Sequence, residues 1–209
     1  MLIRVEIFVK PGHIDPAAES IKKTLISAGY KQVKVEYCRI YFLEGDISKP
    51  EAELIAQGLL TDPLNEESRI FYSFLGYKPG PCEAEIAYNP GVMDPVSKSV
   101  KKGIVDILGK DAVEFVRTAK RVKIIGIEEE TFPEIIKILF NPLIEHIVDY
   151  KMYSRVKTLN EFSGEKYEFQ LKTIDILNVS SKTLEEAVII LDGLKELGLK
   201  DGYSERHGE

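Results

Sequence analysis

The chain has 209 residues, of which 44% are hydrophobic and 30% are charged. This is ordinary usage for a globular protein, and it excludes collagen-like, low-complexity and intrinsically disordered chains. The net charge is −6 and no region concentrates positive charge, which argues against nucleic-acid binding as the main role. The longest apolar runs fall far short of the ~20 residues that a membrane-spanning helix needs, so we expect no membrane segment.

The two cysteines, Cys38 and Cys82, lie far apart in the sequence and have no histidine neighbours. This arrangement predicts neither a disulfide framework nor a metal site. The first residues carry a charge at every second position after Ile3, unlike the apolar stretch of a signal peptide. We therefore expect a reduced, cytoplasmic protein.

An internal repeat runs through the first 150 residues at an offset of 79. Three pairs of segments are related by it: residues 4–16 and 83–95, residues 20–23 and 99–102, and residues 62–64 and 141–143. The first pair shares the motif Pro-Gly-x-x-Asp-Pro. Because the motif and the segments after it keep one spacing, the sequence predicts two copies of one folding unit.

Each copy is predicted to begin with a strand, a turn and an amphipathic helix. Apolar residues alternate with Glu6 in the first copy and with Glu85 in the second, which is the period of a strand. The Pro-Gly pair then forms a turn, and an aspartate caps a helix whose first residue is proline. The residues that define this turn and cap are Pro11, Gly12, Asp15, Pro16, Pro90, Gly91, Asp94 and Pro95.

The rest of each copy is predicted to add a middle strand, a second helix and a last strand. Strands are expected at residues 33–44, 113–126, 69–75 and 144–153, with a hairpin left open for the second of these. Ser48 and Thr131 begin the capping boxes of the two second helices. This order predicts an α+β fold of two tandem two-layer ferredoxin-like units, packed together as an intramolecular pseudo-dimer.

We therefore divide the chain into unit 1 (residues 1–78), unit 2 (residues 82–153) and a C-terminal extension (residues 154–209). The extension matches neither unit. Its alternating residues 167–171 predict a strand, and a capping box at Thr183 predicts a helix before a polar tail.

No group of residues indicates a catalytic, cofactor or metal site. His13, His146 and His207 lie far apart and without metal-ligand spacing. Cys38 neighbours an arginine, but we interpret it as a small packing residue of a strand. The acidic residues 128–130 are interpreted as favourable charge at a helix N-terminus rather than as magnesium ligands. We expect no catalytic residue, no cofactor and no metal.

Arg117, Lys120 and Arg121 form the densest basic group. One interpretation is a solvated strand edge, where charges discourage edge-to-edge aggregation. The other is a contact with an acidic partner or a phosphate. The acidic net charge favours the first interpretation, and the three residues remain a candidate partner contact.

The repeated motifs resemble those of a known family. They are residues 5–12, 15–16 and 59–64 in the first copy, and residues 90–95, 116–118 and 141–145 in the second. These segments resemble PurS, the small subunit of phosphoribosylformylglycinamidine synthase in purine biosynthesis. Two such units in tandem also resemble the N-terminal domain of the large, single-chain synthases.

The resemblance implies a non-catalytic component that bridges two subunits in an ATP-dependent amidation with ammonia drawn from glutamine. The implied partners are a PurL-like synthetase and a PurQ-like glutaminase, which carry the chemistry of the family. A homodimer stays open. Residues 154–209 would then correspond to the linker that leads into a synthetase, in a chain that is split or truncated.

Two other functions stay open. Tandem ferredoxin-like units in ACT-like regulatory proteins bind small molecules in the cleft between them, although fold analogy is a weak argument. Ferredoxin-like sheets also bind RNA by stacking bases on aromatic residues. RNA binding is disfavoured, because the chain has no tryptophan and a negative net charge.

Overall fold

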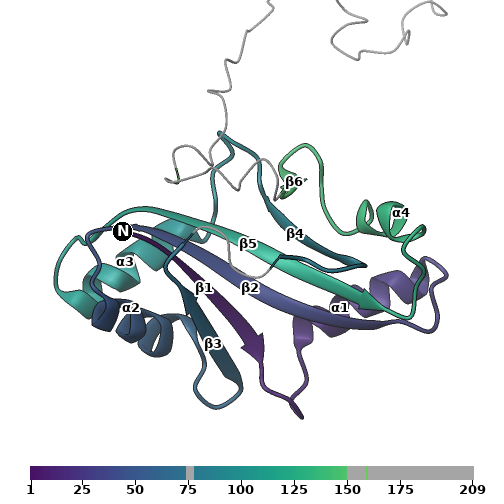
Figure 1. The fold of residues 1–209 in the computed structure, drawn as a ribbon, viewed down its shortest axis with the longest axis horizontal. Helices are drawn as coiled ribbons and strands as arrows, with labels where there is room; N and C mark the ends of the chain where they lie inside the picture. The colour runs from purple at the N-terminus through teal and green to yellow at the C-terminus, as the bar shows by residue number, and fades with distance from the viewer. Residues whose placement is uncertain (74–77, 150–158, 160–209) are drawn as a thin grey trace, which may run out of the picture. The chain divides into compact units, whose positions relative to one another are not determined.

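Six segments form the strands of one sheet, and apolar residues are most frequent in the four strands other than the two at its edges. The computed structural model describes residues 1–73, 78–149 and 159 (Figure 1). Within these residues the strands are β1 (Leu2–Val9), β2 (Lys34–Gly45), β3 (Glu66–Phe71), β4 (Glu83–Tyr88), β5 (Val113–Ile125) and β6 (Glu145–Ile147). They lie in the order β3-β1-β2-β5-β4-β6, and every neighbouring pair is antiparallel.

The helices connect the strands, and the order of helices and strands before residue 72 recurs after residue 82. They are α1 (Pro16–Ser27), α2 (Lys49–Ile55), the π-helix η1 (Ala56–Leu60), α3 (Ser97–Leu108) and α4 (Phe132–Ile136). Strand, helix, strand, helix and strand therefore follow one another in residues 2–71, the first segment, and again in residues 83–147, the second segment. The predicted α+β class is confirmed.

The helix starts agree with the sequence in the first segment and differ in the second. Asp15 caps α1 by accepting hydrogen bonds from the N–H groups of Ala17 and Ala18, at 2.9 and 3.1 Å. Ser48 and Glu51 form the predicted capping box of α2. The cap predicted at Asp94 is wrong, because α3 begins only at Ser97 and Pro95 precedes it.

Asp94 is instead tied to the neighbouring strand. Its Oδ1 accepts from the N–H of Val96 at 2.9 Å, while its Oδ2 accepts from the N–H and the hydroxyl of Thr118, at 2.6 and 2.8 Å. The carboxylate is buried and fully engaged, so a bond to β5 replaces the expected helix cap.

The strand predictions hold for the middle strands and shift for the last ones. β5 is one continuous strand rather than a hairpin. β3 lies three residues before its predicted start, and β6 has only 3 residues. The strand and helix predicted beyond residue 159 lie outside the described residues.

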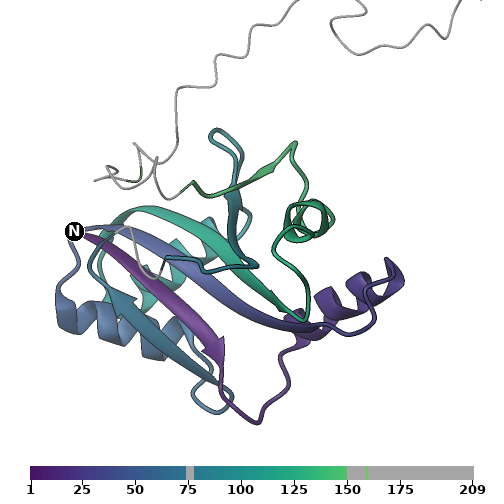
Figure 2. The same cartoon turned by 45° about the vertical axis from the view of Figure 1, so that its right-hand side comes forward.

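All the helices pack on one face of the sheet, in two groups that each combine both segments. One core contains Ile55 and Leu60 of α2 and η1 together with Val100 and Ile104 of α3. The other contains Leu25 of α1 with Ile135 and Ile136 of α4. Figures 1 and 2 show these two groups at opposite ends of the long strands β2 and β5. The helix layer therefore joins the two segments.

The opposite face of the sheet holds a third, smaller core. It contains Cys38, Ile40 and Phe42 of β2 and Ala87 of β4, and the residues beyond the sheet that pack here are Val148 and Leu159. Leu159 also donates its N–H to the Glu44 carboxylate at 2.7 Å. All the residues that the structure describes belong to one compact unit.

Candidate functional site

The two segments meet along β2 and β5. These strands pair without interruption from Lys34 opposite Ile125 to Glu44 opposite Phe115, and a bulge follows before Gly45 pairs with Val113. Both strands are long, with 12 and 13 residues, and each carries apolar residues towards the helices. The pairing makes one continuous sheet from the strands of both segments.

A glycine at each end of this ladder allows close approach of the two backbones. A Cβ on Gly45 would lie 2.1 Å from the carbonyl oxygen of Ala112, and a Cβ on Gly126 would lie 2.4 Å from that of Gln32. In both cases the glycine belongs to one segment and the oxygen to the other. The ladder therefore needs residues without side chains at these two positions.

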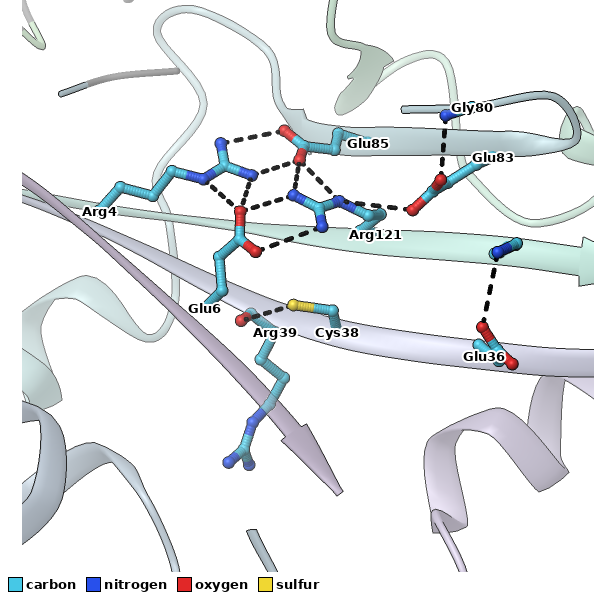
Figure 3. Close-up of polar contacts among 10 residues, drawn as sticks. Arg4, Glu6, Glu36, Cys38, Arg39, Gly80, Glu83, Glu85 and Arg121 are labelled. Atoms are coloured by element: carbon cyan, nitrogen blue, oxygen red, sulfur yellow. Dashed lines mark hydrogen bonds and ion pairs between the residues drawn. The ribbon is translucent and has the colours of Figure 1, made fainter. Parts of the chain in front are cut away.

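Four charged side chains lie buried where β1, β4 and β5 face the small core (Figure 3). The Arg4 guanidinium donates to Glu6 at 2.7 Å and to Glu85 at 3.2 Å and through a second, shorter contact. The Arg121 guanidinium donates to Glu6 at 2.6 and 3.2 Å and to Glu85 at 2.7 and 2.9 Å. Each arginine thus binds both glutamates, and we call these four residues the charge quartet.

The charge quartet links the two segments electrostatically. Its side chains are at most 5% exposed, and its two positive and two negative charges balance. A further carboxylate, that of Glu83, is 7% exposed and lies 3.8 Å from the Arg121 guanidinium. Burial disfavours the charged form of Arg121, but the Glu85 carboxylate and the hydrogen bonds to Glu6 and Glu85 raise its pKa above the ordinary arginine value. Buried charges in such a cluster are tolerated only as long as each keeps its partners.

The strand edge expected around Arg117, Lys120 and Arg121 is wrong, because β5 is an interior strand. Arg121 belongs to the charge quartet, and Lys120 binds Glu145 at 2.8 Å. Arg117 remains partly exposed. One sequence signal pointed to the quartet: Glu6 and Glu85 are identical residues at equivalent positions in the first strand of each copy.

Cys38 lies beside the quartet and is a packing residue. It is 2% exposed, and its thiol donates to the backbone oxygen of Arg39 at 3.4 Å. Burial raises the pKa of this thiol to about 12, although the nearby Arg121 charge opposes the rise. The thiol is therefore protonated and poorly nucleophilic at neutral pH.

We expect iodoacetamide at pH 8 to alkylate Cys82 well before Cys38 in the folded chain. Cys82 is partly exposed whereas Cys38 is buried, and alkylation requires both access and a thiolate. Peptide mass spectrometry over a time course measures the two rates, and alkylation in denaturant provides the control in which the rates converge. Equal rates in the folded chain would contradict the buried position of Cys38.

A cleft of about 190 Å³ lies on the helix side, over the middle of β2 and β5. The side chains that line it include Tyr37, Tyr41, Tyr88, Arg39, Lys120 and Glu145. Its two cations are paired within the chain, Arg39 with Glu66 at 2.7 Å and Lys120 with Glu145 at 2.8 Å. The cleft therefore offers aromatic and neutralised polar groups rather than a positive site for an anion.

His146 lies on the edge strand β6, opposite Ala87 of β4 and so on the helix-free face of the sheet. Its Nδ1 is 3.2 Å from Oδ1 of Asn89. Burial, with a contribution from the Arg117 charge, lowers the pKa of the imidazole. His146 is thus held neutral at physiological pH, whereas His13 lies exposed in the turn after β1 and His207 lies outside the described residues.

The turns that precede β3 and β6 are built by the same hydrogen bonds. Asp62 Oδ1 accepts from the N–H of Leu64 at 2.9 Å, and Asn141 Oδ1 accepts from that of Leu143 at 3.0 Å. A glutamate four residues further on accepts from the N–H of Asp62 at 2.9 Å and, in the second segment, from that of Asn141 at 3.1 Å. The offset of 79 thus relates contacts as well as residues.

The residues that the structure describes offer neither a metal site nor a membrane span. They hold no group of three or more histidine, cysteine or acidic side chains placed to bind a metal ion. No helix among them is both long enough and apolar enough to cross a membrane.

Comparison with known proteins connects the first segment to one family. Residues 2–72 match the family model of PurS, described as phosphoribosylformylglycinamidine (FGAM) synthase. These residues are therefore similar to the PurS family. No curated protein matches the chain.

The matched PurS residues include every strand and helix of the first segment, from β1 to β3. The family connects the chain to FGAM synthase and so to purine biosynthesis. Within the PurS segment, β2 provides the strand that pairs with β5, and β1 provides Arg4 and Glu6 of the charge quartet. The PurS segment is thus bound to the second segment through both its backbone and its charges.

Proposed function

We propose that this chain is a bridging component of FGAM synthase, which joins a PurL-like synthetase to a PurQ-like glutaminase during transfer of glutamine-derived ammonia. The observation that carries the proposal is the match of residues 2–72 to the PurS family of FGAM synthase. In this role the chain acts through its surface and shape. A cytoplasmic location, expected from the cysteine usage, is part of the proposal.

We further propose that residues 1–78 and 82–153 are two tandem PurS-like units packed as a pseudo-dimer. The recurring element order and the recurring turn contacts at an offset of 79 support it. So do the helix groups, since α1 packs with α4 and α2 packs with α3, as two related units exchanging helix contacts would. Fusion keeps the two units at an effective concentration of order millimolar.

Of the basic residues on β5, we propose Arg117 as a contact to a partner. Lys120 and Arg121 already bind carboxylates within the chain, whereas Arg117 is partly exposed on the helix-free face. An acidic side chain of the synthetase or the glutaminase is the contact that its charge favours.

The test is an amidation assay with purified synthetase and glutaminase components of FGAM synthase, with formylglycinamide ribonucleotide and ATP as substrates. Adding this chain is expected to raise the glutamine-dependent rate at least roughly tenfold, equal to ~1.4 kcal/mol of coupling. The ammonia-dependent rate reports the synthetase alone and should change far less. An unrelated acidic protein at the same concentration is the control. If neither rate responds to the chain, the bridging role is wrong.

A further inference from the structure

Four large apolar side chains are much more exposed than any other in the described residues. The exposed fractions are 80% for Ile14, 77% for Leu64, 71% for Met93 and 83% for Leu143, and no other large apolar residue described exceeds 49%. Burying such a side chain fully contributes ~1.5–3 kcal/mol. Burial of these four side chains against a partner would therefore contribute strongly to the free energy of binding.

The four residues occupy two pairs of equivalent positions. Ile14 and Met93 are related by the offset of 79, and so are Leu64 and Leu143. Single exposed apolar residues are common on protein surfaces, but here strong exposure recurs at the same two positions of both segments. We call Ile14 and Leu64 the first tip, and Met93 and Leu143 the second tip.

Both tips are held in place by hydrogen bonds. Lys10, in the connection that carries Ile14, donates from its N–H at 2.8 Å and from its Nζ at 2.6 Å to carbonyls of the turn that carries Leu64. Asn89 donates in the same way, from its N–H at 2.8 Å and its Nδ2 at 3.1 Å, to the turn that carries Leu143. Because the turns are already ordered, binding at a tip costs little conformational entropy.

The tips lie towards opposite edges of the sheet. The first follows β1 and precedes β3, the second follows β4 and precedes β6, and β2 and β5 separate these pairs of strands. In Figure 1 the connections of the first tip leave the sheet at the bottom, and those of the second leave it at the top. A single flat membrane cannot receive both tips at once, and the net charge of −6 disfavours an anionic membrane.

A second copy of the chain is also a poor occupant. Tip-to-tip contacts between copies would be repeated at the opposite side of each molecule and would produce open filaments. Two different protein surfaces, one on each side, fit the arrangement without such growth.

From this geometry we infer that each tip is a docking knob that inserts into an apolar pocket of one catalytic component of the synthase, with a different component at each tip. The inference rests on the proposed function and adds the residues that make the contacts. The two segments thus use equivalent positions, with Ile14 replaced by Met93, to engage two unlike partners.

The test measures the binding of the full chain to the isolated synthetase and to the isolated glutaminase of FGAM synthase. Two double variants are compared with the wild type: Ile14→Ser with Leu64→Ser, and Met93→Ser with Leu143→Ser. Each is expected to weaken binding of one component at least ~30-fold and to leave the other within about twofold. The two variants should affect different components.

The control is Leu54→Ser with Ile138→Ser, which removes two apolar side chains that are 49% and 46% exposed outside the tips. It should bind both components like the wild type, and thermal unfolding checks that all variants stay folded. The inference would be overturned, while the bridging role stands, if both tip variants bound with wild-type affinity or if one tip variant lost both components equally. It would also be overturned if the wild type grew filaments or was retained on anionic phospholipid vesicles. If the wild-type chain binds neither component, the bridging role falls and the inference falls with it.

Discussion

Replacing Arg121 with methionine is expected to lower the free energy of unfolding by ~3–5 kcal/mol. The substitution keeps the length and apolar stem of the side chain but removes one positive charge of the quartet. Glu6 and Glu85 then lie buried around Arg4 alone, and Glu83 loses its ion pair with Arg121, so negative charge is in excess. Guanidinium denaturation followed by circular dichroism measures the change.

Two further variants separate the loss of charge balance from the loss of packing. Lys123→Met changes a 41% exposed residue of the same strand and should cost less than ~1 kcal/mol, as surface ion pairs do. Combining Arg121→Met with Glu85→Gln restores neutrality in the quartet and should recover part of the lost stability. A double variant less stable than Arg121→Met would show that charge balance is not what the quartet maintains.

Replacing Gly45 with alanine is expected to cost at least ~3 kcal/mol, at the upper end of the usual cost of overpacking. The new Cβ would lie 2.1 Å from Ala112 O and 2.8 Å from Val113 Cα. Both are backbone atoms of the other segment, so no side-chain rotation can relieve the clash. Hydrogen exchange should show faster exchange along β2 and β5, since the two strands must separate locally to admit the methyl group.

Gly126 and Gly12 provide a matched pair that tests whether close approach of the two segments excludes a Cβ. Both have a positive φ, +94° and +90°, but a Cβ on Gly126 would meet Gln32 O at 2.4 Å while one on Gly12 would meet nothing within 4 Å. Gly12→Ala therefore measures the left-handed backbone strain alone, ~1–2 kcal/mol. Gly126→Ala should cost clearly more, and equal costs would show that close approach of the segments does not limit residue 126.

The local elements could be predicted because their determinants are neighbours in the sequence. Alternation at Glu6 and Glu85 marked β1 and β4, and Asp15 capped α1 through N–H groups two and three residues away. Asp94 has the same local motif, yet its Oδ2 binds Thr118, 24 residues further on. A local motif could not reveal this distant bond, so the start of α3 was misplaced.

The prediction that the basic residues lie at a strand edge was wrong for a related reason. Arg117, Lys120 and Arg121 look alike in the sequence, and alternation along a strand separates only Lys120 from the other two. Whether a face is solvated depends on what packs there. Glu6 and Glu85 come from strands that the chain brings to the two sides of the β2–β5 pair, and they bury Arg121 while Arg117 stays partly exposed.

The amino-acid sequence alone determined the repeated motif at an offset of 79, the order of strands and helices and the resemblance to PurS. These features could be predicted because periodicity, turn residues and caps act over a few neighbouring positions. Only the tertiary structure decided that β2 pairs with β5, that each helix group combines both segments, that Arg121 is buried and that the two apolar tips point to opposite sides. These features depend on contacts between residues tens of positions apart, and such contacts exist only once backbone pairing and burial have brought the segments together.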